Sequence, residues 1–588
     1  MAHLSLNALG LALLLVLVGG LLAWNTQTAG GTIQIRDVRF VGTNGTMMSA
    51  LLYIPEGVTA ENPAPGILAV HGYINSRETQ DGFAIEFARR GYVVLALDQT
   101  GHGYSDPSAF ANGFGGPDGL KYLRSLDIVD PENVAMEGHS MGGWASLAAA
   151  ATYPDDYKAI VLEGSSTGAP FAADGTAEWP RNMALVFSEW DEFSQLMWGV
   201  DLPKDMVDTD KLKTLFGTDQ TVEVGTLYGS IEDGTARMLY MPRGTHPNDH
   251  ISTEAIGNAI EWMQMTLDGG NGLAPSDQVW YWKEIGSFIG FIGFVLFLFP
   301  VGALLLKSEF FKELVVTVPQ LKGATGTTWW VAAAITVVLP ALTFFWLQNN
   351  GNDWFPAGAF WPQTITTGIT VWAVGNGLIS LVLFAVWHYM TNRKAGATME
   401  NYGLTWDNRI NLRKIGKSLL LAICIIVPGY ALLLIAAAVF TIDFRLWVVA
   451  LKPMSTLHFQ ISLAYLIPFM FFFLVSSTIL NSQLRRARAD GSTMGLGRTM
   501  LLNGVLLALG IFLMLLLQYI PVMTGGTLPL GESLLTIVAF QFVPLLFIVG
   551  LISTYFFHKT GRIYVGAFVC ALFVTWYIVA GQAIQFAF

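Results

Sequence analysis

Cysteine and charged residues are both scarce in this chain. Its 588 residues include only two cysteines, Cys424 and Cys570, and both lie in apolar runs, so the sequence gives no sign of a disulfide framework. Charged residues make up 13% of the chain and hydrophobic residues 53%. Soluble globular proteins seldom reach this balance whereas polytopic membrane proteins do, so the composition predicts a membrane protein.

Ionisable residues are almost absent from the apolar runs in the second half of the chain. Proton and ion relays through a membrane need carboxylates or histidines within the spans, so this scarcity argues against a relay. The sequence implies no metal ion and no organic cofactor, and we expect no nucleic-acid partner.

The charge that is present is divided unevenly. Residues 1–276 include 33 acidic and 14 basic residues, whereas residues 277–588 include 10 acidic and 18 basic residues. Where the two parts meet, the stretch DGGNGLAPS that begins at Asp268 is rich in turn formers and predicts a hinged linker. The predicted boundaries are 30–268 for the acidic domain, 269–283 for the linker and 284–588 for the apolar domain.

One apolar run precedes the acidic domain. It extends from Ala8 to Trp24 and, with Leu4 and Leu6, approaches the ~20 residues that a spanning helix needs. No Lys or Arg stands before it and no clear small-residue cleavage site follows. We therefore favour an uncleaved transmembrane anchor at residues 1–25 over a removed signal peptide.

Further apolar segments after the linker each have about the length that crosses a hydrocarbon core. They predict an all-α membrane domain of about eight helices. The segments are approximately 285–306, 327–348, 364–390, 418–441, 458–480, 499–522, 533–556 and 564–586.

Loop charge predicts how these helices are oriented. Basic residues gather in alternate loops, and the positive-inside rule places such loops in the cytoplasm. We therefore predict a multi-pass protein of the cell membrane, in contact with membrane lipids, whose acidic domain lies on the extracytoplasmic face. The basic residues of these loops are Lys307, Lys312, Lys322, Arg393, Lys394, Arg409, Arg413, Lys414, Lys417, Arg485, Arg486, Arg488, Arg498, Lys559 and Arg562.

The acidic domain alternates predicted strands with predicted helices. A hairpin at 32–53 is followed by short buried-strand runs with helical stretches between them. This alternation predicts a doubly wound, mainly parallel sheet with helices on both faces. The strand runs are 66–70, 93–97, 134–136, 159–162 and 237–241, and a final helix is expected at 253–267.

Three of these strands end in polar motifs, and ligands gather at the carboxyl ends of strands in such sheets. The motifs are HGY at His71, DQTGHGYS at Asp98 and GHSMGG at Gly138. In the third motif, a sharp turn from strand to helix would project the Ser140 hydroxyl. Gly138 and Gly142 are small enough for that turn, so the pattern indicates a nucleophilic serine.

With these motifs the chain resembles the α/β-hydrolase family over residues 32–268. Within that family it is most similar to the dienelactone-hydrolase and prolyl-oligopeptidase-like branch, which also opens with an antiparallel hairpin like GTMMSALLYIP. The resemblance implies that Ser140 is the nucleophile and that the backbone amides of Tyr73 and Met141 form the oxyanion hole.

The resemblance also implies a late histidine as the base and a carboxylate to orient it. His246, between the last predicted strand and the final helix, is the expected base, with His250 second. The family usually places its acid after the seventh strand, and here Asp233 is the expected acid. Glu163, at the end of the 159–162 strand, is the alternative, and Glu232 is also possible.

A lid is expected at about 169–218, where Met183, Val186, Phe187, Trp190, Phe193 and Met197 recur at helical spacing. We expect Trp190 and Phe193 of this stripe to contact an apolar substrate.

The sequence therefore predicts a membrane-bound serine hydrolase that cleaves esters, thioesters or amides of lipid-like or acylated substrates through an acyl-serine intermediate. Two alternatives are an acyltransferase with the same triad and a transporter-like protein with a non-catalytic hydrolase-like domain.

Overall fold

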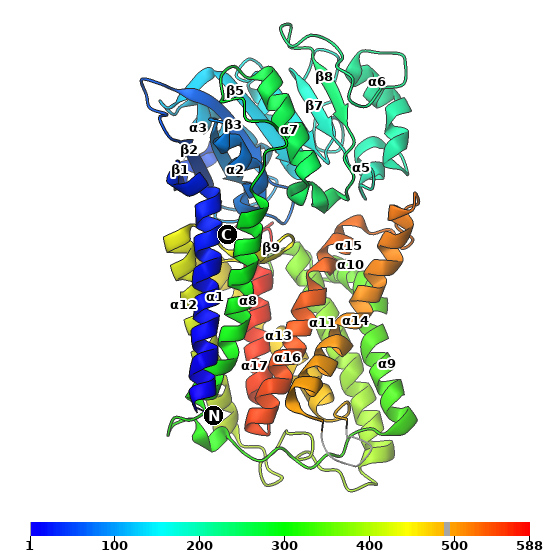
Figure 1. The fold of residues 1–588 in the computed structure, drawn as a ribbon. Coiled ribbons are helices and arrows are strands. Elements are labelled where there is room, and N and C mark those ends of the chain that lie inside the picture. Colours follow the sequence, from blue (N-terminus) through cyan, green and yellow to red (C-terminus); the bar gives the residue numbers. More distant parts are fainter. Residues whose placement is uncertain (1, 487–493, 588) are drawn as a thin grey trace.

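An α/β part rests on one end of a bundle of long helices in the computed structural model of the protein (Figure 1), which describes residues 2–486 and 494–587. Helix α1 (Ala2–Gln27) runs along the bundle and leads directly into the α/β part. Of the basic loop residues named above, Arg488 lies outside the described residues.

The α/β part contains one sheet of eight strands in the order β1-β2-β4-β3-β5-β6-β7-β8. The pairs β1–β2 and β2–β4 are antiparallel, and every other neighbouring pair is parallel. The strands are β1 (Ile33–Val41), β2 (Met47–Pro55), β3 (Ala64–Val70), β4 (Val93–Asp98), β5 (Val129–His139), β6 (Ala159–Glu163), β7 (Met183–Val186) and β8 (Arg237–Tyr240).

Helices cover both faces of this sheet because its central strands are apolar on both sides. In β3, Leu68 and Val70 belong to one buried cluster while Ile67 and Ala69 belong to the other, as the alternation of a strand requires. Helices α3 (Gly116–Arg124) and α4 (Met141–Thr152) pack on the first face, and α2 (Asp81–Arg89) and α7 (Thr253–Thr266) pack on the second. The predicted doubly wound α/β-hydrolase fold is confirmed.

The helical interpretation of the stripe that begins at Met183 is wrong for its first residues. Met183 to Val186 form β7, which pairs in parallel with β6 and β8 inside the sheet. A run of four apolar residues is too short for periodicity to distinguish a strand from a helix. The additional helices α5 (Ser194–Trp198) and α6 (Asp210–Phe216) follow β7 and precede β8.

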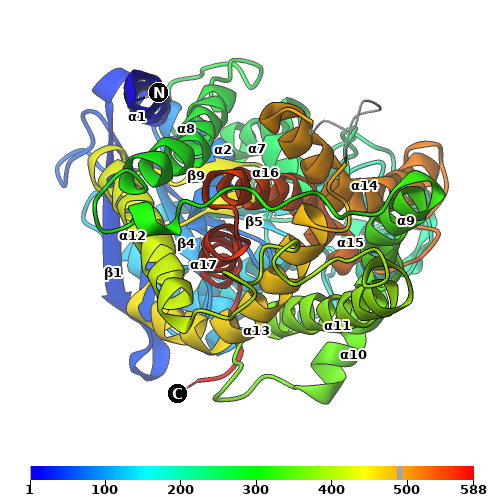
Figure 2. The ribbon, with the colours of Figure 1, turned by 90° about the horizontal axis from the view of Figure 1, so that it is seen from below.

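The second half of the chain is mainly helical, as predicted, but it is not all-α, because β9 (Phe444–Leu446) and β10 (Val449–Leu451) form a short antiparallel hairpin. Among the described residues, seven helices including α1 are long and apolar enough to cross a membrane, or eight if the pair α9–α10, bent by 50°, is one span. Helix α17 is shorter, and neighbouring helices surround it (Figure 2). The helices are α8 (Tyr281–Leu305), α9 (Gly326–Leu342), α10 (Phe344–Trp354), α11 (Thr364–Trp387), α12 (Leu412–Phe440), α13 (Thr456–Asn481), α14 (Leu496–Met523), α15 (Ser533–Phe540), α16 (Phe542–Thr560) and α17 (Tyr564–Ala580).

The segment expected to be a hinge is fastened to the α/β part. The Arg90 guanidinium, at the end of α2, donates hydrogen bonds to the carbonyl oxygens of Leu273 at 3.1 Å, Ala274 at 2.5 Å and Asp277 at 2.9 Å. The turn-forming residues therefore give this segment an irregular backbone that is fixed to the α/β part, and not a hinge.

Glycines let α1 and α8 pack backbone against backbone. A Cβ atom added at Gly19 of α1 would lie 2.4 Å from the carbonyl oxygen of Gly286 and 2.7 Å from the amide nitrogen of Gly290, both on α8. Farther along, a Cβ added at Gly293 would lie 2.8 Å from the carbonyl oxygen of Ala12. Small residues at such a contact are typical of helices that associate in membranes. The two helices that enter and leave the α/β part are thus joined to each other.

We expect Gly19→Val to destabilise the protein, because its side chain has no room against α8. Overpacking of this kind costs about 1–3 kcal/mol. Gly10→Val is the matched control on the same helix, since a Cβ at Gly10 meets no atom within 4 Å. The measurement is the thermal unfolding temperature of the purified protein in detergent, and equal unfolding temperatures for the two variants would contradict this packing.

Candidate active site

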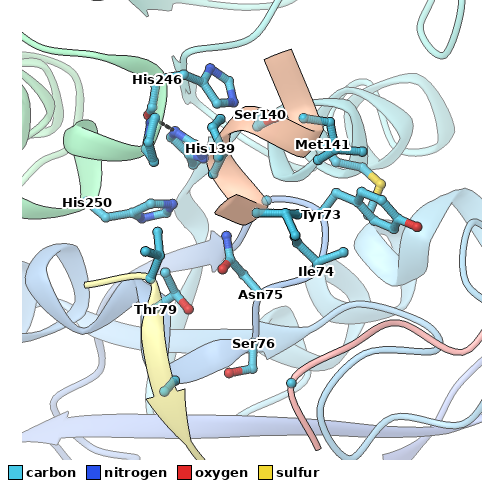
Figure 3. Close-up of a pocket in the computed structure, with 18 of the residues that line it drawn as sticks. Tyr73, Ile74, Asn75, Ser76, Thr79, His139, Ser140, Met141, His246 and His250 are labelled. Atoms are coloured by element: carbon cyan, nitrogen blue, oxygen red, sulfur yellow. Dashed lines mark hydrogen bonds between the residues drawn. The ribbon is translucent and has the colours of Figure 1, made fainter. Parts of the chain in front are cut away.

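A cavity of about 330 Å³ lies where the α/β part meets the helical part (Figure 3). Both parts contribute to its wall. From the α/β part the lining includes Tyr73, Ile74, Ser140, Met141, Trp144, Phe193, Leu196, Met197, His246 and His250; from the helical part it includes Arg445, Trp447, Lys452, Leu534, Ile537, Val538, Gln541 and Tyr577.

Ser140 occupies the sharp turn between β5 and α4 that the sequence predicted. Its backbone has φ 54° and ψ −119°, a conformation that non-glycine residues rarely adopt. The turn is held in place because the Ser140 amide donates to the carbonyl oxygen of Glu163 at 2.7 Å, and the Ser165 hydroxyl donates to the carbonyl oxygen of Ser140 at 2.8 Å. The strain is therefore supported by the surrounding structure.

The glycines on either side of Ser140 are required by close backbone contacts. A Cβ at Gly138 would lie 2.2 Å from the carbonyl oxygen of Gly142, and a Cβ at Gly142 would lie 2.0 Å from the carbonyl oxygen of Val70. As the sequence predicted, these two positions need glycine because a side chain at either one would collide with the backbone of the turn.

Tyr73 and Met141, whose amides are the expected oxyanion-hole donors, both lie beside Ser140 at the cavity. Met141 is the first residue of α4, so its N–H is one of the amides that a helix leaves without an internal partner. Among the described residues neither amide donates a hydrogen bond, and both residues line the cavity beside Ser140 (Figure 3). The side chain of Tyr73 is also held, because its hydroxyl accepts a hydrogen bond from Gln585 at 2.8 Å.

His246 lines the cavity and forms an ion pair with Asp191. Its Nδ1 lies 2.8 Å from Asp191 Oδ2, and both side chains are buried. Burial alone would lower the pKa of His246, but the charge and hydrogen bond of Asp191 outweigh it, so the pKa is raised. Asp191 Oδ1 in turn accepts the amide of Phe193 at 2.7 Å. His246 thus has one nitrogen fixed by a carboxylate and the other available to the cavity.

This partner corrects the expected acid. Asp233 lies exposed in the turn before β8, where its amide donates to the Ser230 hydroxyl at 3.2 Å, and Glu232 is exposed in the same turn. Glu163 is buried at the end of β6, and neither of its carboxylate oxygens has a hydrogen-bond partner among the described residues. Burial, with the Asp249 carboxylate nearby, raises the pKa of Glu163 and favours its neutral form.

Asp191 was missed because the strand before it was assigned to a lid helix. Once Met183–Val186 is recognised as β7, Asp191 is one of the carboxylates, with Glu189 and Glu192, that follow the strand within a few residues. The usable signal was the apolar run MALVF followed by the acidic stretch SEWDE, which begins at Ser188.

The alternative base, His250, lies in the cavity wall beside His139. Its ring lies 4.0 Å from that of His139, whose Nε2 is 2.9 Å from the carbonyl oxygen of His246. Burial, with the nearby His246, lowers the pKa of His250 to about 3. His250 is therefore a neutral ring of the wall, whereas His246 has the carboxylate partner that an orienting triad needs.

The two aromatic residues expected to contact substrate differ in position. Phe193 lines the cavity, and its ring lies 4.5 Å from that of His246. Trp190 is half-buried and is not among the described residues that line this cavity; its amide donates to the carbonyl oxygen of Gly244 at 3.0 Å.

The cavity wall is largely apolar but has charged groups at the helical part. Lys452 is buried, and its Nζ lies 3.4 Å from Glu78 Oε2. Among the described residues, this ion pair is the shortest polar contact of the Lys452 Nζ. Arg445 is paired with Asp443. Within residues 2–486 and 494–587, no group of three or more His, Cys, Asp or Glu side chains is arranged to hold a metal ion.

Comparisons with known proteins agree with the fold of the α/β part. Residues 65–196 match the family described as alpha/beta hydrolase fold. A monoacylglycerol lipase of Mycolicibacterium smegmatis is 30% identical over 138 residues, which is 22% of this chain and 46% of the lipase. A 2-hydroxy-6-oxononadienedioate/2-hydroxy-6-oxononatrienedioate hydrolase of Cupriavidus pinatubonensis is 39% identical over 80 residues, 14% of this chain and 28% of that enzyme.

These matches are partial. The chain spans less than half the length of the curated relatives it matches. Among solved structures, an esterase of Pyrococcus furiosus is 16% identical, with a TM-score of 0.30, and the match covers 40% of this chain and 95% of the esterase. The family match includes Ser140 and Asp191 and ends before His246. The expected branch of the family stays a prediction.

Proposed function

We propose that this chain, whose residues 65–196 match the α/β-hydrolase fold, is a serine hydrolase that cleaves carboxylic esters, thioesters or amides through an acyl-Ser140 intermediate. One observation carries the proposal: a serine in a strained strand-to-helix turn shares a cavity with a histidine that is hydrogen-bonded to a buried aspartate. This combination of nucleophile, base and orienting acid is the arrangement that acyl transfer to a serine requires.

In the proposed mechanism the Ser140 oxygen attacks the substrate carbonyl while His246 Nε2 accepts the hydroxyl proton. Asp191 holds the His246 ring through Nδ1 and stabilises the imidazolium. The amides of Tyr73 and Met141 stabilise the tetrahedral oxyanion. The protonated His246 then donates its proton to the leaving group as the carbonyl–heteroatom bond breaks. Water, deprotonated by His246, then attacks the acyl carbonyl, and His246 returns the proton to the Ser140 oxygen as the acyl–oxygen bond breaks and the acid leaves.

We further propose that the helical part spans the cell membrane and holds the α/β part at the extracytoplasmic face. Large apolar side chains on the outside of the bundle support a lipid environment, as with Ile467 at 73% exposure. The basic loops lie at the end of the bundle away from the α/β part (Figure 1). Contacts join these loops, including Arg485 to the carbonyl oxygen of Pro319 and Arg562 to Glu400, so one basic end faces the cytoplasm.

The position and lining of the cavity support a lipid-like substrate. Its wall combines apolar side chains of the α/β part with Leu534, Ile537 and Val538 of α15, at the end of the bundle. Burial of an acyl chain along this wall would stabilise the complex by about 0.8 kcal/mol for each methylene that is removed from water. The charged Lys452, on the same cavity, suits a polar or anionic end of such a molecule.

The first prediction from the proposed function concerns the nucleophile. We expect Ser140→Ala to abolish covalent labelling by a fluorophosphonate probe and to lower turnover by roughly 10⁴-fold or more, because triad members act as a unit. The unfolding temperature should stay near that of the wild type, so that misfolding is excluded as the cause. Wild-type turnover in this variant would refute the catalytic role of Ser140.

The second prediction separates the proposed acid, Asp191, from the one that the sequence suggested, Asp233. Asp191→Asn removes the charge that fixes the His246 tautomer and should lower kcat by roughly 10⁴-fold. Asp233→Asn is the matched control, and because Asp233 is exposed away from His246 it should leave kcat nearly unchanged. Steady-state kinetics of both variants decide the assignment, and the reverse ranking would return the acid to Asp233.

The third prediction concerns the acyl chain. Wild-type protein in nanodiscs should prefer long-chain esters to acetyl esters in kcat/KM, and Ile537→Ala should reduce this preference several-fold by removing buried contact area. Ile467→Ala, a change on the exposed face of α13, is the control and should leave the preference unchanged. A preference for acetyl esters, unaffected by Ile537→Ala, would exclude a lipid-like substrate.

A further inference from the structure

Glu192, the residue after Asp191, lies between the candidate active site and the helical part. Its Oε2 accepts the backbone N–H of His246 at 2.7 Å, and its Oε1 accepts the hydroxyl of Tyr519 at 2.5 Å. The carbonyl oxygen of Glu192 accepts a third hydrogen bond, from the Ser533 hydroxyl at 2.6 Å. One half-buried residue is therefore bonded to the histidine of the candidate triad and to two helices of the other part.

Both donors from the helical part belong to helices. Tyr519 lies in the last turns of α14, and Ser533 begins α15. The rings of Tyr519 and Trp447 pack on Phe540 at 4.9 Å and 4.8 Å. Trp447 also donates from its indole nitrogen to the carbonyl oxygen of Pro247 at 2.8 Å, one residue after His246. The helical part thus contacts the His246 loop at two points.

We propose that Glu192 and Tyr519 are positioning residues, through which the helical part holds His246 and Asp191 in the geometry that catalysis requires. This inference rests on the proposed function and adds a task for the helical part beyond anchoring. Neither side chain touches the reacting atoms: Glu192 acts on His246 through its backbone N–H, and Tyr519 acts through Glu192.

The physical reason is that each oxygen of the Glu192 carboxylate accepts one of these hydrogen bonds, from the His246 N–H and from the Tyr519 hydroxyl. A buried carboxylate is stabilised by donors to both of its oxygens, and hydrogen bonds to a charged group are about twice as strong as neutral ones. Burial, together with the Asp191 charge, raises the pKa of Glu192 to about 7, while His246 and Tyr519 oppose that rise. Without the Tyr519 hydroxyl, the Glu192 carboxylate would lose one of its two donors. The backbone N–H of His246 would then donate to an acceptor that is held less firmly.

A small displacement of His246 is sufficient to affect catalysis. The reacting groups of an active site must be held within about 0.5 Å, and a misplacement of about 1 Å can cost roughly 100-fold in rate. The loss is expected in kcat, because the cavity wall that binds substrate is unchanged when only a hydroxyl is removed from Tyr519.

The main experiment compares Tyr519→Phe with wild type in the full-length protein in nanodiscs. We expect kcat to fall about tenfold or more with KM unchanged, and the rate of fluorophosphonate labelling of Ser140 to fall in parallel. The matched control is Tyr564→Phe, which removes a tyrosine hydroxyl that donates to the carbonyl oxygen of Leu404 at 2.7 Å, at the basic end of the bundle. The control should keep wild-type kcat.

A double-mutant cycle then tests whether Tyr519 acts through Glu192. Glu192→Ala should lower kcat at least as much as Tyr519→Phe, and adding Tyr519→Phe to it should cause no further loss. Glu192→Gln should restore part of the rate, since its amide oxygen still accepts the His246 N–H and its NH₂ group can donate to the Tyr519 oxygen. A merely structural contact would not give this pattern.

The outcomes are distinguishable. Wild-type protein without turnover or labelling would refute the proposed function and, with it, the positioning role. Active wild-type protein with unchanged kcat in Tyr519→Phe, or losses that add fully in the double variant, would overturn the positioning role alone. Equal losses in Tyr519→Phe and Tyr564→Phe would also overturn it, because the effect would then be a general one on the bundle.

Discussion

The 2.8 Å contact between the Asp191 carboxylate and the His246 ring is the interaction on which the candidate site depends. It requires β7 to lie in the sheet between β6 and β8, because only then does the loop after β7 reach the loop after β8. The Asp191 charge also raises the pKa of His246, although burial of the ring opposes that rise. The strained turn at Ser140 is useful only where a base held in this way faces it.

Docking of the α/β part on the helices is set by buried charges. Lys283 of α8 pairs with Asp81 at the start of α2, and Glu78 lies within 3.6 Å of Arg445 and 3.4 Å of Lys452. Buried ion pairs add little net stability because desolvation offsets their attraction, but each demands one geometry. A shifted α/β part would leave several charges unpaired, so the network fixes the position of the cavity between the two parts.

The sequence was informative wherever the determining contacts are local. The glycines around Ser140 are required by a turn of a few residues, and the apolar strand runs predict a layered sheet. Asp191 was harder to recognise, because its partner is 55 residues away and β7 has only four residues in which to show a period. The fastened linker depends on Arg90, more than 180 residues from its partners, which composition does not reveal.

Contacts from the helical part meet the candidate site at two places. Gln585, beyond α17, holds the hydroxyl of Tyr73 beside one expected oxyanion amide, and Tyr519 holds Glu192 beside the His246 loop. Under the proposed function, a substrate must then reach Ser140 between the two parts, where the apolar wall of α15 meets the α/β part. An amphiphile entering there keeps its chain among apolar side chains up to the reacting carbonyl, so the same boundary that positions the catalytic groups also selects the substrate.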